Sequence, residues 1–397
     1  MNRRVDYKGT DASRAAAGSI ASAPIRAFGR VVVSSTAIVC ALLASIASNA
    51  FAADPDRPRD EAIRAAVERS LPLIQATGAK YRAERECFSC HHQAVPAIAL
   101  EIAAHRGFAI DRSELKAQGK HAVDDLARNA KGYREGKGQG GGVVRAGYAL
   151  WTISVAGIER DETTSAVVHY LLVHDETFGY WKTSSHRPPS EESDFTATGV
   201  ALIGLARFAQ ASDRSAFESR KNKAIDWLES RKPKDAEDRV FKLWGLKFAG
   251  ANRAAIDSAV QDLIQYQRAD GGWGQTDDRA SDAYATGSAL VALSEAGDLK
   301  TDNHSYIKGL AYLLRTQLAD GSWLVKSRSR PFQTYFESGF PHGDDQFIST
   351  AATSWAVAAL ALALPNPESP ELKIAPDRTR SQTGEESARD QSEGERR

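Results

Sequence analysis

The chain has 397 residues, and its 51 Lys and Arg residues balance its 51 Asp and Glu residues, so its formal net charge is zero at pH 7. A balanced charge provides no broadly basic surface, and we therefore expect no nucleic-acid partner. The length is sufficient for one large domain.

The first 52 residues have the pattern of a secretory signal peptide. Arg26 and Arg30 precede an apolar run over residues 31–47, and Ala50-Phe51-Ala52 is a cleavage sequence of the A-x-A type. The alternative is an uncleaved membrane anchor. Because no later segment is long and apolar enough to cross a bilayer, we expect a periplasmic or secreted protein with no membrane span in its mature chain.

Residues 53–365 are predicted to form one all-α domain of about six helical hairpins. The predicted pairs, in chain order, are 61–76 with 95–105, 114–130 with 144–156, 164–173 with 196–209, 217–231 with 240–249, 254–267 with 284–295, and 306–317 with 348–362. Apolar residues cover most of the surface of segment 196–209, which predicts an inner helix. The charged segment 366–397 has no aromatic residue and is predicted to be a disordered tail.

A C-x-x-C-H motif, Cys87-Phe88-Ser89-Cys90-His91, lies in the turn of the first predicted hairpin. This pattern is typical of covalent haem c, in which both thiols join the haem and the histidine binds its iron. The third cysteine, Cys40, lies in the predicted signal segment. We therefore predict one covalent haem c held by Cys87, Cys90 and His91.

Two other interpretations of this motif remain open. The first is a disulfide between Cys87 and Cys90, which an oxidising compartment permits. The second is a zinc site made of Cys87, Cys90, His91 and His92.

A repeated turn of the pattern Q-x-x-D-G-[GS]-W ends at Trp273 and again at Trp323, and a degenerate copy ends at Trp181. Two of the following helices begin with S-D-x-x-A-T-G, at Ser193 and at Ser281. Ser or Asp at such a position is a favourable helix N-cap. A repeat of this kind indicates that one supersecondary unit recurs along the chain.

This arrangement resembles the terpenoid cyclase and protein prenyltransferase superfamily, with squalene–hopene cyclase-like repeats, over roughly residues 61–362. The resemblance implies an α/α toroid, a ring of inner helices wrapped by outer ones, around a cavity that often takes hydrophobic substrates. It also implies structural roles in helix capping and packing for Gln267, Trp273, Gln317 and Trp323.

The chain departs from this superfamily at its reactive residues. The Asp-x-Asp-Asp run that serves as general acid in its protonation-driven cyclases is absent, and so is a cysteine outside Cys87 and Cys90 for the zinc of a prenyltransferase. The resemblance to c-type cytochromes covers only the five-residue motif. We therefore expect the fold to transfer and the known reactions not to.

The turn of the last hairpin, residues 324–347, is the longest, and ring closure would bring it beside the first hairpin. Met1 is the only methionine and lies in the predicted signal, so His342 is the first candidate for the distal iron ligand. Arg328 and Arg330 are candidates to pair with the haem propionates. The alternative is a solvated loop in which His342 has no such role.

The leading functional hypothesis is an exported haem c protein, a possible oxidoreductase that transfers electrons with a redox partner or acts on a small or apolar molecule. The alternative is a terpenoid cyclase-like or prenyltransferase-like enzyme of the isomerase or transferase class with no cofactor, in which the candidate catalytic acids are Asp194, Asp282 and Asp344. A third hypothesis is a non-catalytic binding scaffold.

Overall fold

The computed structural model of the chain describes residues 56–330 and 334–367. The predicted signal segment and the predicted tail beyond Pro367 lie outside the described residues. Within the described ranges, no helix combines the length and hydropathy that a bilayer span requires.

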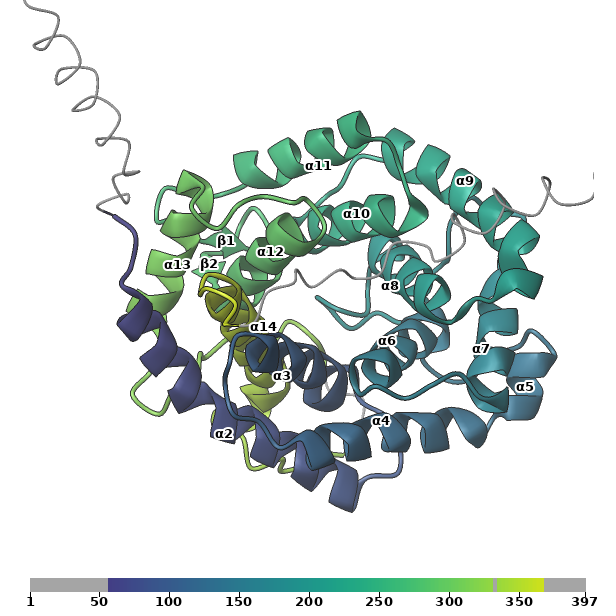
Figure 1. Ribbon diagram of the computed structural model, residues 1–397, viewed down its shortest axis with the longest axis horizontal. Helices are drawn as coiled ribbons and strands as arrows, with labels where there is room; N and C mark the ends of the chain where they lie inside the picture. Colours follow the sequence, from purple (N-terminus) through teal and green to yellow (C-terminus); the bar gives the residue numbers. More distant parts are fainter. Residues whose placement is uncertain (1–55, 331–333, 368–397) are drawn as a thin grey trace, which may run out of the picture. The chain divides into compact units, whose positions relative to one another are not determined.

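The described residues belong to one compact unit, an α/α toroid in which inner helices alternate along the chain with outer helices (Figure 1). The inner helices are α3 (Val95–His105), α6 (Gly142–Val155), α8 (Asp194–Phe208), α10 (Ala236–Ala249), α12 (Ala283–Glu295) and α14 (Gln346–Leu362). The outer layer comprises α2 (Asp60–Glu84), α4 (Arg112–Ala127), α5 (Ala130–Arg134), α7 (Glu162–Val173), α9 (Arg214–Ser230), α11 (Arg253–Gln265) and α13 (His304–Thr316).

The predicted fold class is confirmed, and each predicted hairpin corresponds to an outer and an inner helix. Helix α2 continues beyond the predicted end at Ala76 because its buried face extends through Gly78 and Tyr81. Four short helical elements were not predicted: α5, the π-helical turn η1 (Cys90–Ala94) that precedes α3, and the 3-10 turns η2 (Ala211–Asp213) and η3 (Gly343–Asp345). A two-stranded antiparallel ribbon, β1 (Trp273–Gly274) with β2 (Ser281–Asp282), lies between α11 and α12.

Burial distinguishes the two layers. On the inner helix α14, every residue from Ile348 to Leu362 is buried, whereas the outer helix α9 buries Arg220, Ala224 and Leu228. A helix that is apolar on all sides needs packing partners on all sides, which an inner ring supplies. The outer helices need only one apolar stripe, and their other faces carry the charged residues.

The three repeat tryptophans make the same pair of hydrogen bonds. The indole Nε1 donates to a carbonyl at the end of the preceding outer helix, and the backbone N–H donates to a threonine hydroxyl of the following inner helix. The indole acceptors are Leu171, Leu263 and Leu313 for Trp181, Trp273 and Trp323, and the threonines are Thr198, Thr286 and Thr353. The turn at the degenerate copy, which ends at Trp181, therefore has the same hydrogen bonds as the turns at Trp273 and Trp323.

The glutamines of the repeat join one hairpin to the next. Gln267 Nε2 donates to Ser305 O, 2.8 Å away in α13, and Gln317 Nε2 donates to Ala66 O, 2.8 Å away in α2. The second contact, between the last outer helix and the first, closes the ring, and α14 packs against α3 in the inner layer. The predicted closure of the sixth hairpin on the first is therefore confirmed.

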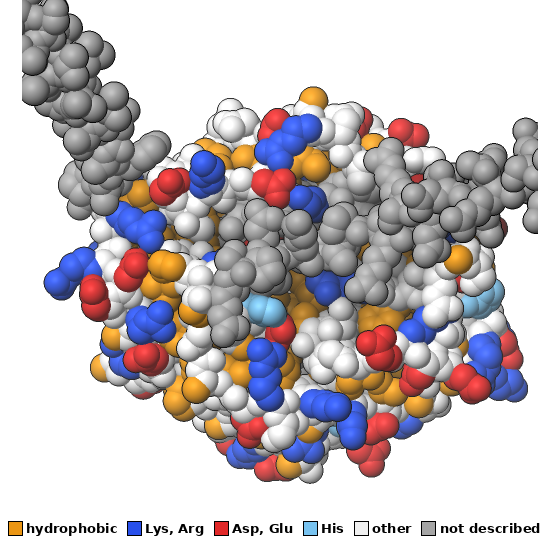
Figure 2. All heavy atoms as spheres, viewed as in Figure 1, with side chains coloured by type: hydrophobic (Ala, Val, Ile, Leu, Met, Phe, Trp, Pro, Cys, Tyr) orange, Lys and Arg blue, Asp and Glu red, His pale blue; other side chains and the backbone are white. Residues whose placement is uncertain are grey.

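Charged side chains of both signs are interspersed over the face shown in Figure 2, and apolar side chains are visible between them. No large region of one sign appears on this face. This distribution agrees with the balanced charge of the sequence and provides no extended basic surface there.

The first prediction concerns the close packing of the inner helices. A Cβ added at Gly287 would lie 2.6 Å from the backbone carbon of Trp355, so Gly287→Ala must push α12 away from α14. We expect the free energy of unfolding, measured by urea denaturation, to fall by about 1–3 kcal/mol. Gly140→Ala is the control, because a Cβ at Gly140 meets open space; an equal effect of the two substitutions would contradict this account.

Candidate functional site

The amino-terminal ends of the inner helices meet at one mouth of the toroid, here called the amino-terminal mouth. Ser193, the N-cap of α8, donates a hydrogen bond to Asp238 in the first turn of α10. Glu237 accepts hydrogen bonds from Thr196 of α8 and Tyr284 of α12, both at 3.3 Å. Helix amino termini carry partial positive charge, so this mouth favours acidic groups.

Cys87 and Cys90 are free thiols in different surroundings. Cys87 is half-buried, and its Sγ lies 3.2 Å from the hydroxyl of Tyr81. Cys90 is buried, and this burial, together with the nearby Glu191 carboxylate, raises the pKa of its thiol. Cys90 is therefore a neutral thiol at pH 7, whereas nucleophilic and redox chemistry require the thiolate.

The His91 imidazole lies between a hydroxyl and a carboxylate. Its Nε2 is 3.0 Å from Ser190 Oγ, and its Nδ1 is 3.9 Å from Glu191 Oε1. Glu191 also forms an ion pair with Arg187, and the same two residues pair through their backbones and so close the loop that presents Ser190. Burial lowers the pKa of His91, which leaves its ring neutral near pH 7.

His92 has a packing role. Its ring stacks on Tyr81 with a centroid separation of 5.1 Å and contacts the edges of Phe336 and Phe347. Burial lowers its pKa to about 3, so the ring is neutral. Among the described residues, no group of three or more His, Cys, Asp or Glu side chains converges in a way that could hold a metal ion, and the zinc interpretation gains no support.

The residues of the C-x-x-C-H motif do not fit a haem in this arrangement. An iron bound at His91 Nε2 would take the place of the Ser190 hydroxyl, which is 3.0 Å from that nitrogen. The side chains of Cys90 and Phe88 beside it are buried against protein, at 6% exposed each. Cys90 and Phe88 therefore offer no free surface for a haem face, although Cys87 and His91 are partly exposed.

Two of the other residues predicted to serve a haem, His342 and Arg328, form hydrogen bonds with residues outside the motif. The Nε2 of His342 is 2.8 Å from Ser322 Oγ, and the residues that surround His342 are not those that surround His91. Arg328 Nε donates to Gln275 Oε1 at 2.8 Å, over the start of α12. Arg330 is exposed. The sequence thus identified a long turn correctly, but the structure does not bring its cations and His342 to the motif.

The three candidate acids of the alternative hypothesis have unequal surroundings. Asp194 accepts from the backbone N–H of Thr183 at 2.8 Å, and Asp344 is exposed. Asp282 caps α12 through the N–H of Ala285 and accepts from Gln275, both at 2.9 Å, while burial raises its pKa. All three lie near the starts of inner helices, but their hydrogen bonds are those of capping and loop residues.

Glu237 has the most unusual carboxyl group at the mouth, and the sequence analysis did not select it. The residue is 4% exposed, and burial with the nearby Asp235 carboxyl raises its pKa to about 8. One oxygen, Oε1, accepts the hydrogen bonds of Thr196 and Tyr284, whereas Oε2 is buried without a partner. Burial without a hydrogen-bond donor at this oxygen disfavours the charged carboxylate and favours the protonated form.

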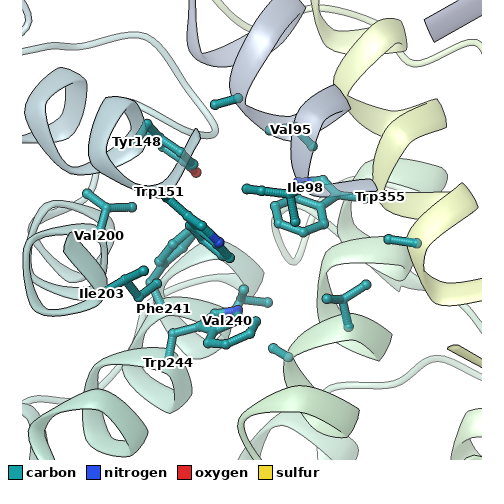
Figure 3. Close-up of a cluster of buried hydrophobic side chains, with 14 of the residues drawn as sticks. Val95, Ile98, Tyr148, Trp151, Val200, Ile203, Val240, Phe241, Trp244 and Trp355 are labelled. Carbon is teal, nitrogen blue, oxygen red and sulfur yellow. The ribbon is translucent and has the colours of Figure 1, made fainter. Parts of the chain in front are cut away.

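A cluster of aromatic side chains fills the centre of the ring next to Glu237. Figure 3 shows Tyr148 and Trp151 of α6, Phe241 and Trp244 of α10, and Trp355 of α14 directed toward one another. The ring centroids of Trp151 lie 5.4 Å from Trp244 and 6.5 Å from Trp355. None of the five side chains is more than 3% exposed, so the centre is closed to bulk water.

The signal for Glu237 was present in the sequence. Asp235-Ala236-Glu237-Asp238 has the spacing acid-x-acid-acid, with Glu in the middle position. A search restricted to Asp passes over this run because it tests residue identity and not the carboxyl chemistry. Ser190 and Glu191 carried no such signal, since their contact with His91 joins segments 99 residues apart.

Comparison with known proteins supports the fold. Residues 240–343 match the family model of the squalene–hopene cyclase C-terminal domain. The drimenyl diphosphate synthase of Streptantibioticus cattleyicolor is 30% identical over 198 residues, which are 47% of this chain and 36% of that protein. A probable squalene–hopene cyclase of Sinorhizobium fredii is 27% identical over 205 residues, 43% of this chain and 28% of that protein. The chain therefore spans about a third of the length of these relatives.

Two solved structures are also similar. The type II terpene cyclase MstE from Scytonema, in its apo form, shares 15% identity with a TM-score of 0.48, over 77% of this chain and 99% of that one. A protein from Actinoplanes shares 14% identity with a TM-score of 0.47, over 76% and 99%.

None of these matches supports haem attachment, electron transfer or an oxidoreductase, so those remain predictions without support. The family match and the helical architecture together assign the chain a terpenoid-cyclase-like α/α toroid fold.

Proposed function

We propose that the protein is a haem-free, terpenoid cyclase-like enzyme that protonates a carbon–carbon double bond of a small isoprenoid, with Glu237 as the general acid. The observation that carries this proposal is the buried carboxyl of Glu237, whose pKa is raised to about 8 and whose Oε2 has no hydrogen-bond partner. A general acid is most effective when its pKa lies near the working pH.

The neighbouring acids support this assignment because their environments differ. Asp238 accepts hydrogen bonds from Ser193 Oγ and from the backbone N–H of Lys234. Asp235 caps α10 through the N–H of Asp238 at 3.0 Å. Glu237 lies between them in sequence with no charged partner, and is therefore the carboxyl that retains its proton.

The aromatic cluster supplies the ring faces and the dry surroundings that stabilise the carbocation formed when Glu237 protonates a double bond. Glu237, Phe241 and Trp244 are spaced so that they share one face of α10, which brings the acid to the edge of the cluster. The faces of aromatic rings attract a cation by roughly 0.5–2 kcal/mol each. A centre closed to water also prevents early capture of the cation by hydroxide or water.

The proposed step is balanced without any further reactant. The Glu237 carboxyl proton forms a C–H bond with one alkene carbon, and the other alkene carbon becomes cationic while Glu237 becomes a carboxylate. A second double bond of the substrate attacks the cation and closes a ring, and loss of a proton from an adjacent carbon restores a double bond. Return of a proton to Glu237 completes an isomerisation.

The relatives agree with this class of reaction. The names of the two curated proteins refer to a drimenyl diphosphate synthase and a squalene–hopene cyclase, and both names denote isoprenoid compounds. The acid-x-acid-acid spacing at residues 235–238 follows the Asp-x-Asp-Asp run of the protonation-driven cyclases, with Glu in place of the middle Asp.

The second prediction tests the acid directly. Glu237→Gln keeps the size of the side chain but cannot donate a carboxylic proton, so turnover should fall by at least about 100-fold. The purified full chain is incubated with farnesyl diphosphate and, separately, with squalene in D₂O, and products are analysed by gas chromatography and mass spectrometry. Wild-type product should carry one deuterium from solvent.

The matched control is Glu295→Gln. Glu295 is half-buried and also has a raised pKa, but it is the last residue of α12, at the opposite end of that helix. This control should retain wild-type turnover. Equal activity of Glu237→Gln and the wild type on a cyclised substrate would remove Glu237 from the reaction.

The third prediction uses stability and needs no substrate. The pKa of a glutamate in water is 4.5, and that of Glu237 in the folded chain is about 8, so between these values the native state holds a proton that the unfolded chain releases. The stability from this group is complete below pH 4.5 and is lost as the pH rises toward 8, with a slope of about 1.4 kcal/mol per pH unit.

Glu237→Gln removes this dependence, so its free energy of unfolding should decline less steeply than that of the wild type over the same range. Urea denaturation of both proteins at several pH values measures the difference. Parallel pH profiles would mean that Glu237 is ionised in the folded protein.

A further inference from the structure

We propose that Ser190, His91 and Glu191 form a second reactive site, in which His91 activates Ser190 as a nucleophile toward a carboxylic ester with an apolar part. This assignment uses the histidine of the C-x-x-C-H motif as a base for serine and not as an iron ligand. It is independent of the proposed role of Glu237.

The three side chains have the connectivity of a nucleophile, a base and an orienting acid. Ser190 Oγ lies 3.0 Å from His91 Nε2, within hydrogen-bond distance. The other ring nitrogen, Nδ1, faces Glu191 Oε1 at 3.9 Å. A neutral ring that carries its proton on Nδ1 presents the lone pair of Nε2 to the serine hydroxyl, and the carboxylate stabilises the imidazolium formed when that proton moves.

The carboxylate is itself held in place. Glu191 is 5% exposed, pairs with Arg187 and lies 3.4 Å from Ser185 Oγ, so its orientation toward His91 is fixed by charge and by hydrogen bonding. The backbone pairing of Arg187 with Glu191 fixes the loop that carries Ser190. Positioning by a supporting layer of this kind is what an activated nucleophile requires.

The candidate donor for the developing oxyanion is Tyr148. Tyr148 is fully buried, its hydroxyl has no hydrogen-bond partner, and its pKa is raised by burial and by charges that include Glu237, Cys90 and Glu191. A buried hydroxyl without an acceptor can donate to a negative oxygen as it forms. Tyr148 also borders the central aromatic cluster, which would take the apolar part of the ester.

The reaction follows from these positions. Ser190 Oγ attacks the ester carbonyl carbon and its proton passes to His91 Nε2. The carbon–oxygen bond to the alcohol breaks, and the alcohol leaves with that proton. Water then attacks the acyl-serine, giving one proton to His91, and the carboxylic acid is released as the proton returns to Ser190.

A second serine–histidine pair provides the control. Ser322 Oγ is 2.8 Å from His342 Nε2, but there Asp320 accepts a hydrogen bond from the serine itself, at 2.6 Å. The Asp320 carboxylate therefore accepts a hydrogen bond from the Ser322 hydroxyl and does not orient the His342 ring. Ser322 should be unreactive although it touches a histidine.

The fourth prediction is tested with diisopropyl fluorophosphate, a small electrophile that reports activated serines regardless of the natural ester. The full chain is produced in a host with c-haem maturation, treated with the reagent, and analysed by intact mass and peptide mapping. We expect one label, on Ser190. Ser190→Ala should abolish it, His91→Gln should slow labelling by at least about 100-fold, and Ser322→Ala should label like the wild type.

Cooperative urea unfolding verifies that each variant is folded, and Glu191→Gln replaces His91→Gln if the latter is not. Absence of label from the folded wild type, label at Ser322, or labelling unaffected by His91→Gln overturns the proposal. A haem mass on the peptide that contains Cys87 and Cys90 also overturns it, because His91 would then serve the iron. Loss of Glu237 activity leaves all these outcomes unchanged, so the two proposals fail separately.

Discussion

The hydrogen bonds of the repeat tryptophans are the constraint on which the rest of the structure depends. Each indole N–H donates to the end of an outer helix, while the same residue's backbone N–H donates to a threonine of the next inner helix. Buried donors of this kind are costly to leave unpaired, so outer helix, turn and inner helix are fixed as one unit. Because the unit recurs with the same polarity, the inner helices begin at one mouth, and the reactive side chains gather there without any motif that joins them in sequence.

At that mouth, carboxyl groups that are close neighbours in the chain differ in the hydrogen bonds that they accept. Asp238 and Glu237 lie in the same turn of α10, but Asp238 receives two donated hydrogen bonds and Glu237 receives long contacts at one oxygen only. Removing a carboxylate from water is expensive unless charge or hydrogen bonds replace the solvent. Burial therefore raises the pKa of Glu237, which has only these long contacts, to about 8. Separation of pKa values by environment is the usual basis for assigning an acid among several carboxyls.

The sequence predicted the periodic features of this fold well because each rests on local chemistry that repeats. Helix pairing, the Gly-Trp turns and the Ser193 and Asp282 caps were accessible from the sequence pattern, and the expected six-hairpin toroid implied ring closure. The residues of the candidate site were harder to predict from the sequence. The C-x-x-C-H motif indicated haem, yet the neighbours of His91 come from a loop 99 residues away, which spacing cannot reveal. His342 was selected because its turn is long, but length does not determine that Ser322 occupies its Nε2. Glu237 was missed because the search specified aspartate where the chemistry requires only a carboxyl.

The two proposed sites are both largely buried, but their reactions differ in the need for water. Ser190 is 1% and Glu191 5% exposed, against 4% for Glu237 and at most 3% for the aromatic cluster, and the His91 side chain is 19% exposed. Hydrolysis of an acyl-serine consumes water, and the exposed part of His91 is the side from which water would reach Ser190. A carbocation is destroyed by water, and the dry centre excludes it. Burial raises the pKa of Tyr148, and Glu237, Cys90 and Glu191 raise it further, so its hydroxyl stays a neutral donor in either reaction. The partial exposure of His91 is therefore the feature that distinguishes a site able to use water from one that excludes it.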